Sequence, residues 1–253
     1  MDDEKDRDRQ PVIEVRNMFK RFGSFTANND LSFDVYKGEI FGFLGANGAG
    51  KTTAMRILCG LSKPSSGVIS VAGFDIYRQV AQIKKNIGYM SQKFSLYEDL
   101  TVYENMRFFG GIYGLKRSEI KDRSQQLLEM LGFTHARNTL IKEIPLGWRQ
   151  KLAFCVALLH RPQIVFLDEP TGGVDPYTRR QFWEMIHKTA AEGTTVFVTT
   201  HYMDEAEYCD RVSIMVDGEI RVIGSPPELI KRFNVVNMNE VFLKLARAKP
   251  EIV

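Results

Sequence analysis

The feature that most constrains this chain is the segment GANGAGKT at positions 45–52. It fits the pattern G-x-x-x-x-G-K-[ST], and it stands between an apolar, strand-like segment and a helix-compatible one, as a phosphate-binding loop requires. Glycines let such a loop fold tightly enough for successive backbone N–H groups to face one anion, and the N-terminus of the following helix adds positive charge. The segment therefore predicts a polyphosphate site on an α/β fold.

Two side chains of the loop extend this prediction to the outer phosphates and a metal ion. Lys51 supplies a mobile cation, and the hydroxyl of Thr52 is placed to bind Mg²⁺. The residues that we expect to surround the bound phosphates are Gly45, Ala46, Asn47, Gly48, Ala49, Gly50, Lys51, Thr52 and Thr53.

A second chemical signal is the pair of acids that ends the apolar segment IVFLDE, Asp168 and Glu169. An aspartate at the end of a buried strand can hold Mg²⁺, usually through water, and the acid after it can polarise an attacking water molecule. Acids at a strand end are also common as helix caps or on solvated edges. The pair becomes a strong signal only together with the phosphate loop.

Strand-like and helix-like segments alternate along most of the chain, whereas 93–160 has helical spacing throughout. This pattern predicts an α/β core with a helical insertion at 93–160. The predicted strands are 12–19, 30–36, 39–45, 67–73, 86–92, 163–168, 194–200 and the hairpin 211–224, and the main helices are 51–61, 101–115, 118–133, 148–160 and 175–193. The predicted division is a disordered charged tail (1–10), the core (11–92 and 161–235), the helical subdomain (93–160) and a C-terminal helix (236–253).

The composition of the chain mainly excludes some classes of partner and targeting segment. Hydrophobic residues make up 44% and charged residues 26%, which is ordinary for a globular protein with a full core. The net charge of +3 is too small to indicate nucleic acid or anionic lipid as a partner. We find neither a run of about 18 apolar residues that would span a bilayer nor a signal-peptide core. The cysteines at 59, 155 and 209 form no CxxC pair and are predicted to be small core residues.

The order of motifs resembles the nucleotide-binding domain of an ABC transporter. GANGAGKT is followed by Gln92, a signature-like segment, IVFLDEP, GGVD and His201, and the likeness covers nearly the whole chain after the tail. YMSQKFSLYEDLTVYEN and NEVFLKLA resemble the exporter-type, multidrug-efflux-like branch. The resemblance implies an α/β fold, a P-loop NTPase core with an N-terminal antiparallel β subdomain and an inserted α-helical subdomain. It also implies an ATPase that uses ATP and Mg²⁺ and acts at the cytoplasmic face of the inner membrane as a peripheral subunit. Its implied partners are a transmembrane permease and a second nucleotide-binding domain, as a homodimer or a heterodimer, and not nucleic acid.

The resemblance also implies roles for individual residues. Phe22 resembles the aromatic that stacks on adenine, with Phe25 as its rival. Gln92 resembles the glutamine that touches Mg²⁺ or the attacking water, and His201 the histidine that contacts the γ-phosphate. Asp175 resembles the acid that crosses the dimer interface, and it is equally a helix N-cap. The implied metal ligands are Thr52, Gln92 and Asp168, and the implied catalytic residues are Lys51, Glu169 and His201.

The segment IPLGWRQK at 144–151 departs from the family's LSGG signature. In one alignment Pro145 replaces the serine and has neither a hydroxyl nor an N–H, while Leu146 adds bulk where backbone approaches the nucleotide. Gly147 and the helix N-terminus still offer a partial anion site to the nucleotide of the partner domain. A second alignment, LGWRQ on LSGGQ, keeps the leucine and glutamine but shifts the helix by two residues.

Three functions fit these features to different degrees. The main one is the ATP-hydrolysing subunit of a membrane exporter. A soluble ABC-type ATPase acting on nucleic acid or the ribosome usually has two ATPase domains or a long insertion, and this chain has neither feature. A nucleotide-gated module with weak hydrolysis is favoured by the altered signature and opposed by the presence of Glu169 and His201.

Overall fold

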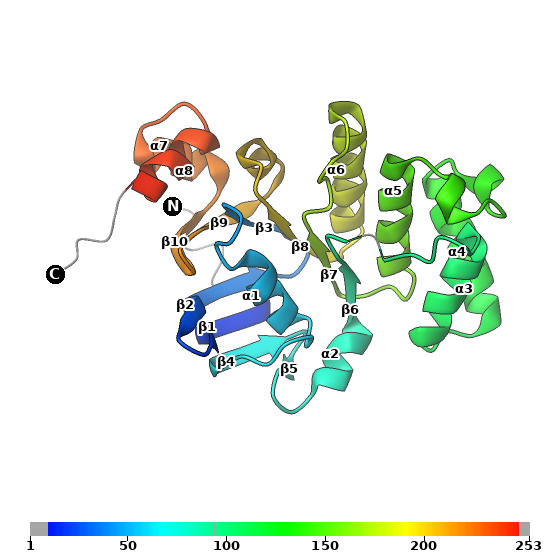
Figure 1. Ribbon diagram of the computed structural model, residues 1–253, viewed down its shortest axis with the longest axis horizontal. Helices are drawn as coiled ribbons and strands as arrows, with labels where there is room; N and C mark the ends of the chain where they lie inside the picture. Colours follow the sequence, from blue (N-terminus) through cyan, green and yellow to red (C-terminus); the bar gives the residue numbers. More distant parts are fainter. Residues whose placement is uncertain (1–9, 94, 248–253) are drawn as a thin grey trace.

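The computed structural model describes residues 10–93 and 95–247 (Figure 1). The tail predicted at 1–10 therefore lies outside the described residues except for Gln10, and so do residues 248–253 of the predicted C-terminal helix. Two β-sheets occupy the centre of the molecule, and a helical group stands to one side of them (Figure 1).

The first sheet is antiparallel and has four strands in the order β2-β1-β4-β5. Its first two strands alternate between buried and exposed positions, so that Ile13, Val15 and Met18 of β1 are fully buried. This confirms the predicted antiparallel subdomain. The strands are β1 Pro11–Phe22, β2 Phe25–Tyr36, β4 Ser66–Val71 and β5 Phe74–Asp75.

The second sheet has six strands in the order β10-β9-β3-β8-β7-β6, and every pairing is parallel except that of β9 with β10. Every residue of β3, β7 and β8 is buried, as expected for parallel strands covered on both faces. Asp217 (φ 50°) and Gly218 (φ 80°) form the predicted hairpin turn. The strands are β3 Ile40–Gly45, β6 Ile87–Met90, β7 Ile164–Asp168, β8 Thr195–Thr200, β9 Arg211–Val216 and β10 Glu219–Gly224.

The helices between 93 and 160 form the group beside the sheets (Figure 1). Thr101 and Glu104 make a reciprocal capping box at the start of this group. Among the described residues, none of the helices is both long and apolar enough to cross a bilayer. The α-helices are α1 Lys51–Leu58, α2 Val80–Asn86, α3 Val102–Ile112, α4 Arg117–Met130, α5 Leu146–Ala157, α6 Pro176–Ala191, α7 Pro226–Phe233 and α8 Met238–Arg247, and the 3-10 helices are Thr134–Ala136, Ile141–Glu143 and Met203–Tyr208.

The hydrophobic core lies on both faces of the six-stranded sheet. Side chains of β3 contribute to both parts of it, because successive residues of a strand point to opposite faces. Phe41 and Phe43 pack toward the antiparallel sheet, where ring centroids of Phe33 and Phe43 are 5.4 Å apart and those of Phe43 and Phe197 are 5.2 Å apart. Each of these buried rings contributes about 1.5–3 kcal/mol to stability. The three cysteines are free and buried, as predicted.

This core fixes the carboxyl ends of three parallel strands at one edge of the sheet. There β3 ends at Gly45, β7 at Asp168 and β8 at Thr200. The predicted phosphate loop, the acidic pair and His201 follow those strand ends, so the topology gathers them at the place where open α/β sheets bind ligands.

Candidate active site

In the loop between β3 and α1, position 50 has a backbone conformation and a close neighbour that only glycine can accommodate. This residue has φ 95° and directly precedes the first residue of α1. A Cβ at this position would lie 2.3 Å from the carbonyl oxygen of Ala27 and 2.7 Å from Nδ2 of Asn28. Asn28 Nδ2 in turn donates to the Gly50 carbonyl at 3.1 Å. The strand β2 therefore holds the loop in its tight conformation.

Lys51 is buried inside the loop that it follows. Its Nζ donates to the carbonyl oxygens of Gly45 at 2.8 Å and Ala46 at 3.1 Å, and it lies 3.6 Å from Oε1 of Glu169. Burial lowers the pKa of Lys51, and the charge of Glu169 opposes that shift. A desolvated ammonium that is bonded only to neutral carbonyl oxygens and one nearby carboxylate is well suited to bind an incoming phosphate.

Glu169 is the point at which the predicted catalytic residues meet. Its Oε2 accepts hydrogen bonds from Gln92 Nε2 at 2.9 Å and from His201 Nδ1 at 3.1 Å. Its backbone has φ 48°, held by bonds from its N–H to Thr199 O and Oγ1, both at 3.1 Å. A left-handed conformation at a residue other than glycine costs about 1–3 kcal/mol and is typical of functional sites. In this backbone conformation the carboxylate lies next to the loop that contains Lys51.

Asp168 and Thr52 form an oxygen-rich corner next to the loop. Thr52 Oγ1 donates to Asp168 Oδ1 at 3.0 Å, and Thr199 Oγ1 donates to the same oxygen at 2.7 Å. Burial raises the pKa of Asp168, and these two hydrogen bonds oppose the shift. Mg²⁺ prefers one or two carboxylate or hydroxyl oxygens together with substrate phosphates and water. The donor set at this corner therefore fits Mg²⁺.

A cavity of about 400 Å³ opens over the loop. Phe25, which is 63% exposed, lines it, whereas Phe22, which is 55% exposed, is not part of the lining. Of the two aromatic candidates, Phe25 is thus the one placed at the cavity, and the adenine role of Phe22 stays a prediction. The lining residues are Phe25, Ala27, Asn47, Gly48, Gly50, Lys51, Thr52, Thr53, Gln92 and Glu169.

Gly147 and Asp175 do not line this cavity but form a second cluster around Thr178. A Cβ on Gly147 would lie 2.6 Å from Thr178 Cγ2. Asp175 caps α6, accepting from Thr178 N at 3.0 Å and from Thr178 Oγ1 at 2.6 Å, and these bonds lower the pKa of Asp175. Helix α5 begins at Leu146, two positions earlier than predicted, with Pro145 at the N-cap, where it provides no side-chain hydrogen bond.

We expect Gly147→Ala to destabilise the protein by about 1–3 kcal/mol, because the new methyl group overlaps Thr178, and the overlap is relieved by moving α5 or α6 or by turning the Thr178 side chain out of its bond to Asp175. Gly111→Ala in α3 is the matched control, since a Cβ there meets nothing within 4 Å. It should leave stability unchanged or raise it by about 0.5–1 kcal/mol. Urea unfolding of both variants measures the difference, and equal stabilities would contradict the close approach of the two helices.

Several residues of the site were not predicted from the sequence. Thr199 bonds to both acids, and this depends on the register that pairs it with Asp168 across β7 and β8. Gln150 Nε2 donates to Gly172 O at 3.0 Å and so ties α5 to the loop after Glu169. Only the order of the strands and the packing of the helices reveal these contacts, and neither is encoded in a local motif.

Comparison with known proteins places this geometry in a family. The family described as "ABC transporter" matches residues 28–172. The chain is 46% identical over 220 residues to the probable multidrug ABC transporter ATP-binding protein YbhF of Escherichia coli K12, covering 87% of this chain and 38% of that protein. It is 37% identical over 246 residues to the linearmycin resistance ATP-binding protein LnrL of Bacillus subtilis, covering 94% of this chain and 79% of that protein. This chain thus spans well under half the length of YbhF.

The fold has a close counterpart among solved structures. An ATP-binding subunit of an ABC transporter superposes with a TM-score of 0.84 at 26% sequence identity, covering 93% of this chain and 100% of that one. The likeness extends over both sheets and the helical group and agrees with the predicted fold class. From its phosphate loop, its acidic strand end and these matches, the chain belongs to the ABC transporter ATP-binding family.

Proposed function

We propose that this chain is the ATP-binding and ATP-hydrolysing subunit of a membrane exporter. The observation that carries the proposal is the convergence of Lys51, Gln92 and His201 on the buried carboxylate of Glu169, beside a phosphate loop. The relative YbhF is named as part of a multidrug transporter and LnrL as a resistance protein, and both names are compatible with export. Phosphate release by the purified chain with ATP and Mg²⁺ tests it, and turnover that chelation of Mg²⁺ leaves unchanged would contradict it.

The reaction that fits these residues is attack by water on the γ-phosphorus, with ADP as the leaving group. Glu169 holds the water and accepts its proton, and the hydrogen bond from His201 keeps that carboxylate oriented. Lys51 exchanges its carbonyl partners for the outer phosphates and, with the loop N–H groups, stabilises the charge on them. Thr52, Gln92 and Asp168 would hold Mg²⁺, which when bound neutralises phosphate charge.

We propose further that the cluster of Gly147, Thr178 and Asp175 completes the nucleotide site of a second nucleotide-binding domain. These residues lie outside the cavity over the chain's own phosphate loop, and Gly147 offers the start of a helix to an anion. Pro145 weakens this contribution, because it supplies no hydroxyl. A pair with a second domain of regular signature therefore fits as well as a homodimer.

Pro145→Ser should restore a donor at the start of α5 and raise ATP turnover about two- to tenfold, the equivalent of one added hydrogen bond of about 0.5–1.5 kcal/mol. Pro227→Ser in the first turn of α7 is the matched control and should leave turnover unchanged. Steady-state phosphate release measures both. Should Pro145→Ser have no effect at saturating ATP and high protein concentration, Pro145 does not face a nucleotide.

The transmembrane partner is proposed to dock in an apolar groove of about 520 Å³ between the core and the helical group. Leu61 and Ile112 on its walls are 46% and 63% exposed. Tyr89 also lines it, in strand β6, which leads toward Gln92. Its lining residues are Cys59, Leu61, Ala81, Lys84, Lys85, Ile87, Tyr89, Ile112, Tyr113 and Gly114.

We expect Ile112→Asp to lower the amount of chain bound to the cytoplasmic face of inner-membrane vesicles of its host at least tenfold. The reason is that burying a charge in an apolar contact is costly. Val236→Asp, at a side chain that is 79% exposed outside the groove, is the control and should stay bound. Sedimentation with vesicles measures attachment, and ATP hydrolysis by the isolated chain should be unchanged in both variants. Equal retention of the two variants would exclude this groove.

A further inference from the structure

The two segments that contain the proposed catalytic residues Glu169 and His201 touch twice. The first contact is the hydrogen bond of 3.1 Å between His201 Nδ1 and Glu169 Oε2. In the second contact, Thr171 Oγ1 donates to Oε1 of Glu205 at 2.5 Å. Thr171 is 1% exposed and Glu205 is fully buried, so water does not compete for this second bond. The two segments are therefore joined at the site and again in the interior.

Few residues separate the two contacts along the chain. Thr171 lies within the turn 169–172, which is closed by a backbone hydrogen bond of 3.1 Å between its end residues. Glu205 lies in the 3-10 helix that begins two residues after His201. Its N–H donates at 3.2 Å to the carbonyl oxygen of the residue that directly follows His201. Because both links are short and hydrogen-bonded, a displacement of Thr171 from Glu205 would also disturb the contact at the site.

Glu205 places a carboxylate where burial makes it costly. Its Oε2 has no hydrogen-bond partner among the described residues, and Arg179 of α6 has its Nε 3.6 Å from Oε1, too far for a hydrogen bond. The guanidinium of Arg179 lies 4.1 Å from the ring centroid of Tyr202, beside the histidine of the site. Apolar side chains of similar size often stabilise a fold as well as an incompletely paired buried carboxylate does, or better. Stability alone is therefore a weak reason for a glutamate at this position.

We propose that Glu205 is a positioning residue for ATP hydrolysis. Its hydrogen bond with Thr171 fixes the orientation of the turn that begins at Glu169, which apolar packing would leave less defined. The carboxylate of Glu169 thereby keeps its contact with His201 while it accepts the proton of water. Neither Glu205 nor Thr171 lines the cavity over the phosphate loop, so both act through other residues. This role of Glu205 rests on the proposed function, in which Glu169 activates the water.

Thr171→Val in the full chain removes the donor and keeps the shape of the side chain. We expect kcat for ATP hydrolysis to fall about 10- to 100-fold, because a small misplacement of a reacting group has an effect of this size. KM for ATP should change by less than about threefold, since the phosphate loop is not altered. Thr171→Ser keeps the hydroxyl and should retain about half of kcat or more.

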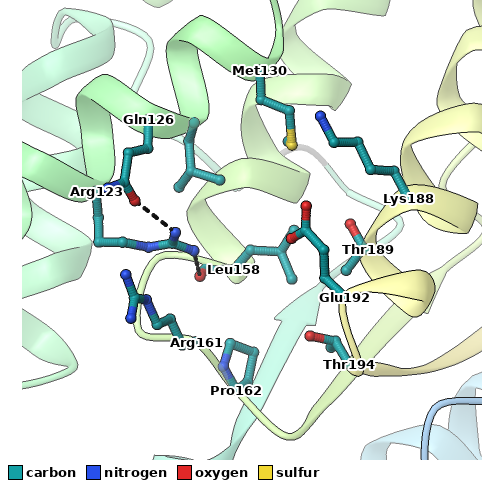
Figure 2. A pocket seen from close by; sticks show the side chains of 11 residues that line it. Arg123, Gln126, Met130, Leu158, Arg161, Pro162, Lys188, Thr189, Glu192 and Thr194 are labelled. Carbon is teal, nitrogen blue, oxygen red and sulfur yellow. Dashed lines mark hydrogen bonds between the residues drawn. The ribbon is translucent and has the colours of Figure 1, made fainter.

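Thr189→Val is the matched control for this substitution. Thr189 is also a buried threonine, 4% exposed, but it lines a cavity of about 440 Å³ between α4 and the far end of α6 (Figure 2). Figure 2 shows it among Lys188, Glu192 and Thr194, none of which belongs to the proposed nucleotide site. Both kcat and KM of this variant should equal those of the unaltered chain.

A double variant separates positioning from stability. Thr171→Val alone leaves the buried carboxylate of Glu205 without its donor, so it should also lower the stability to urea. Thr171→Val combined with Glu205→Met replaces both partners by apolar groups and should regain most of that stability. If Glu205 positions the site, kcat of the double variant should stay about tenfold or more below that of the unaltered chain.

The imidazole of His201 gives a readout that does not depend on turnover. The chain has four histidines, and His201→Ala identifies the ring signals of this one in NMR spectra. These signals should shift or broaden in Thr171→Val, because the carboxylate that contacts the ring is no longer held in place. Thr189→Val should leave them unchanged.

Three results would overturn the proposal. The first is a kcat of Thr171→Val equal to that of Thr189→Val. The second is a double variant in which turnover returns together with stability, which would make Glu205 a purely structural residue. The third is a Thr171→Val variant in which the His201 signals do not change. An unaltered chain that binds ATP without hydrolysing it would instead contradict the proposed function, and the His201 signals would still test the role of Glu205.

Discussion

Lys51→Ala is expected to lower ATP affinity about 10- to 100-fold and turnover about 100- to 1,000-fold. The side chain is only 4% exposed, and its Nζ is held by loop carbonyl oxygens at the mouth of the cavity. Hydrogen bonds to a charged group are worth about 1.5–3 kcal/mol, and a donor aimed at transition-state charge is worth more. Calorimetric titration with ATP measures the first effect and phosphate release the second.

Lys37→Ala, at an exposed lysine next to β3, is the matched control for that variant and should behave like the unaltered chain. Circular dichroism should show the same fold in both variants, because within the described part of the chain the Lys51 ammonium makes hydrogen bonds and an ion pair only with the loop carbonyls and Glu169. If Lys51→Ala keeps its affinity and turnover, the loop is not the nucleotide site, and the proposed function fails with it.

The Glu169→Gln variant should bind ATP as tightly as the unaltered chain, or more tightly, and turn it over about 100- to 10,000-fold more slowly. The amide keeps an oxygen to accept from Gln92 or His201 but cannot take a proton from water. It also removes a negative charge 3.6 Å from Lys51, where the phosphates are proposed to bind. Single-turnover hydrolysis separates the chemical step from binding.

Glu184→Gln is the control for this substitution, since its side chain is 66% exposed on α6 and, among the described residues, forms an ion pair only with Arg180. Turnover of Glu169→Gln within threefold of the unaltered chain would show that another group activates the water. An unaltered chain that binds ATP without hydrolysing it would instead favour the nucleotide-gated module, for which Pro145 is the motivating residue.

The parts of the fold that were predicted correctly are those with local signals. The phosphate loop has its glycines in sequence, and α6 has Asp175 as its cap and Pro176 as its first residue. The buried strands β7 and β8 have apolar centres, IVFL and VFV. By contrast, α2 and β5 span only Val80–Asn86 and Phe74–Asp75, which is too short for a hydrophobic period to appear.

The parts of the site that were missed depend on distant segments meeting. Phe22 and Phe25 are paired across the turn between β1 and β2, so their local sequence does not distinguish them, and only the folded structure shows that Phe25 lines the cavity. The strained backbone of Glu169 follows from the hydrogen bonds to Thr199, on a different strand. Residue type and spacing indicate which side chains do the chemistry, whereas their mutual positions come from the sheet order.

The side chain of Thr178 connects the two other residues of the second cluster, Gly147 and Asp175. Its methyl group abuts Gly147 while its hydroxyl bonds to Asp175, and one torsion, χ1, sets both. A displacement of α5 large enough to push the methyl group into another rotamer would break the bond to Asp175 in the same event. The bond from the Thr178 backbone N–H to Asp175 would remain, so such a movement at the altered signature would cost the cap of α6 one of its two hydrogen bonds.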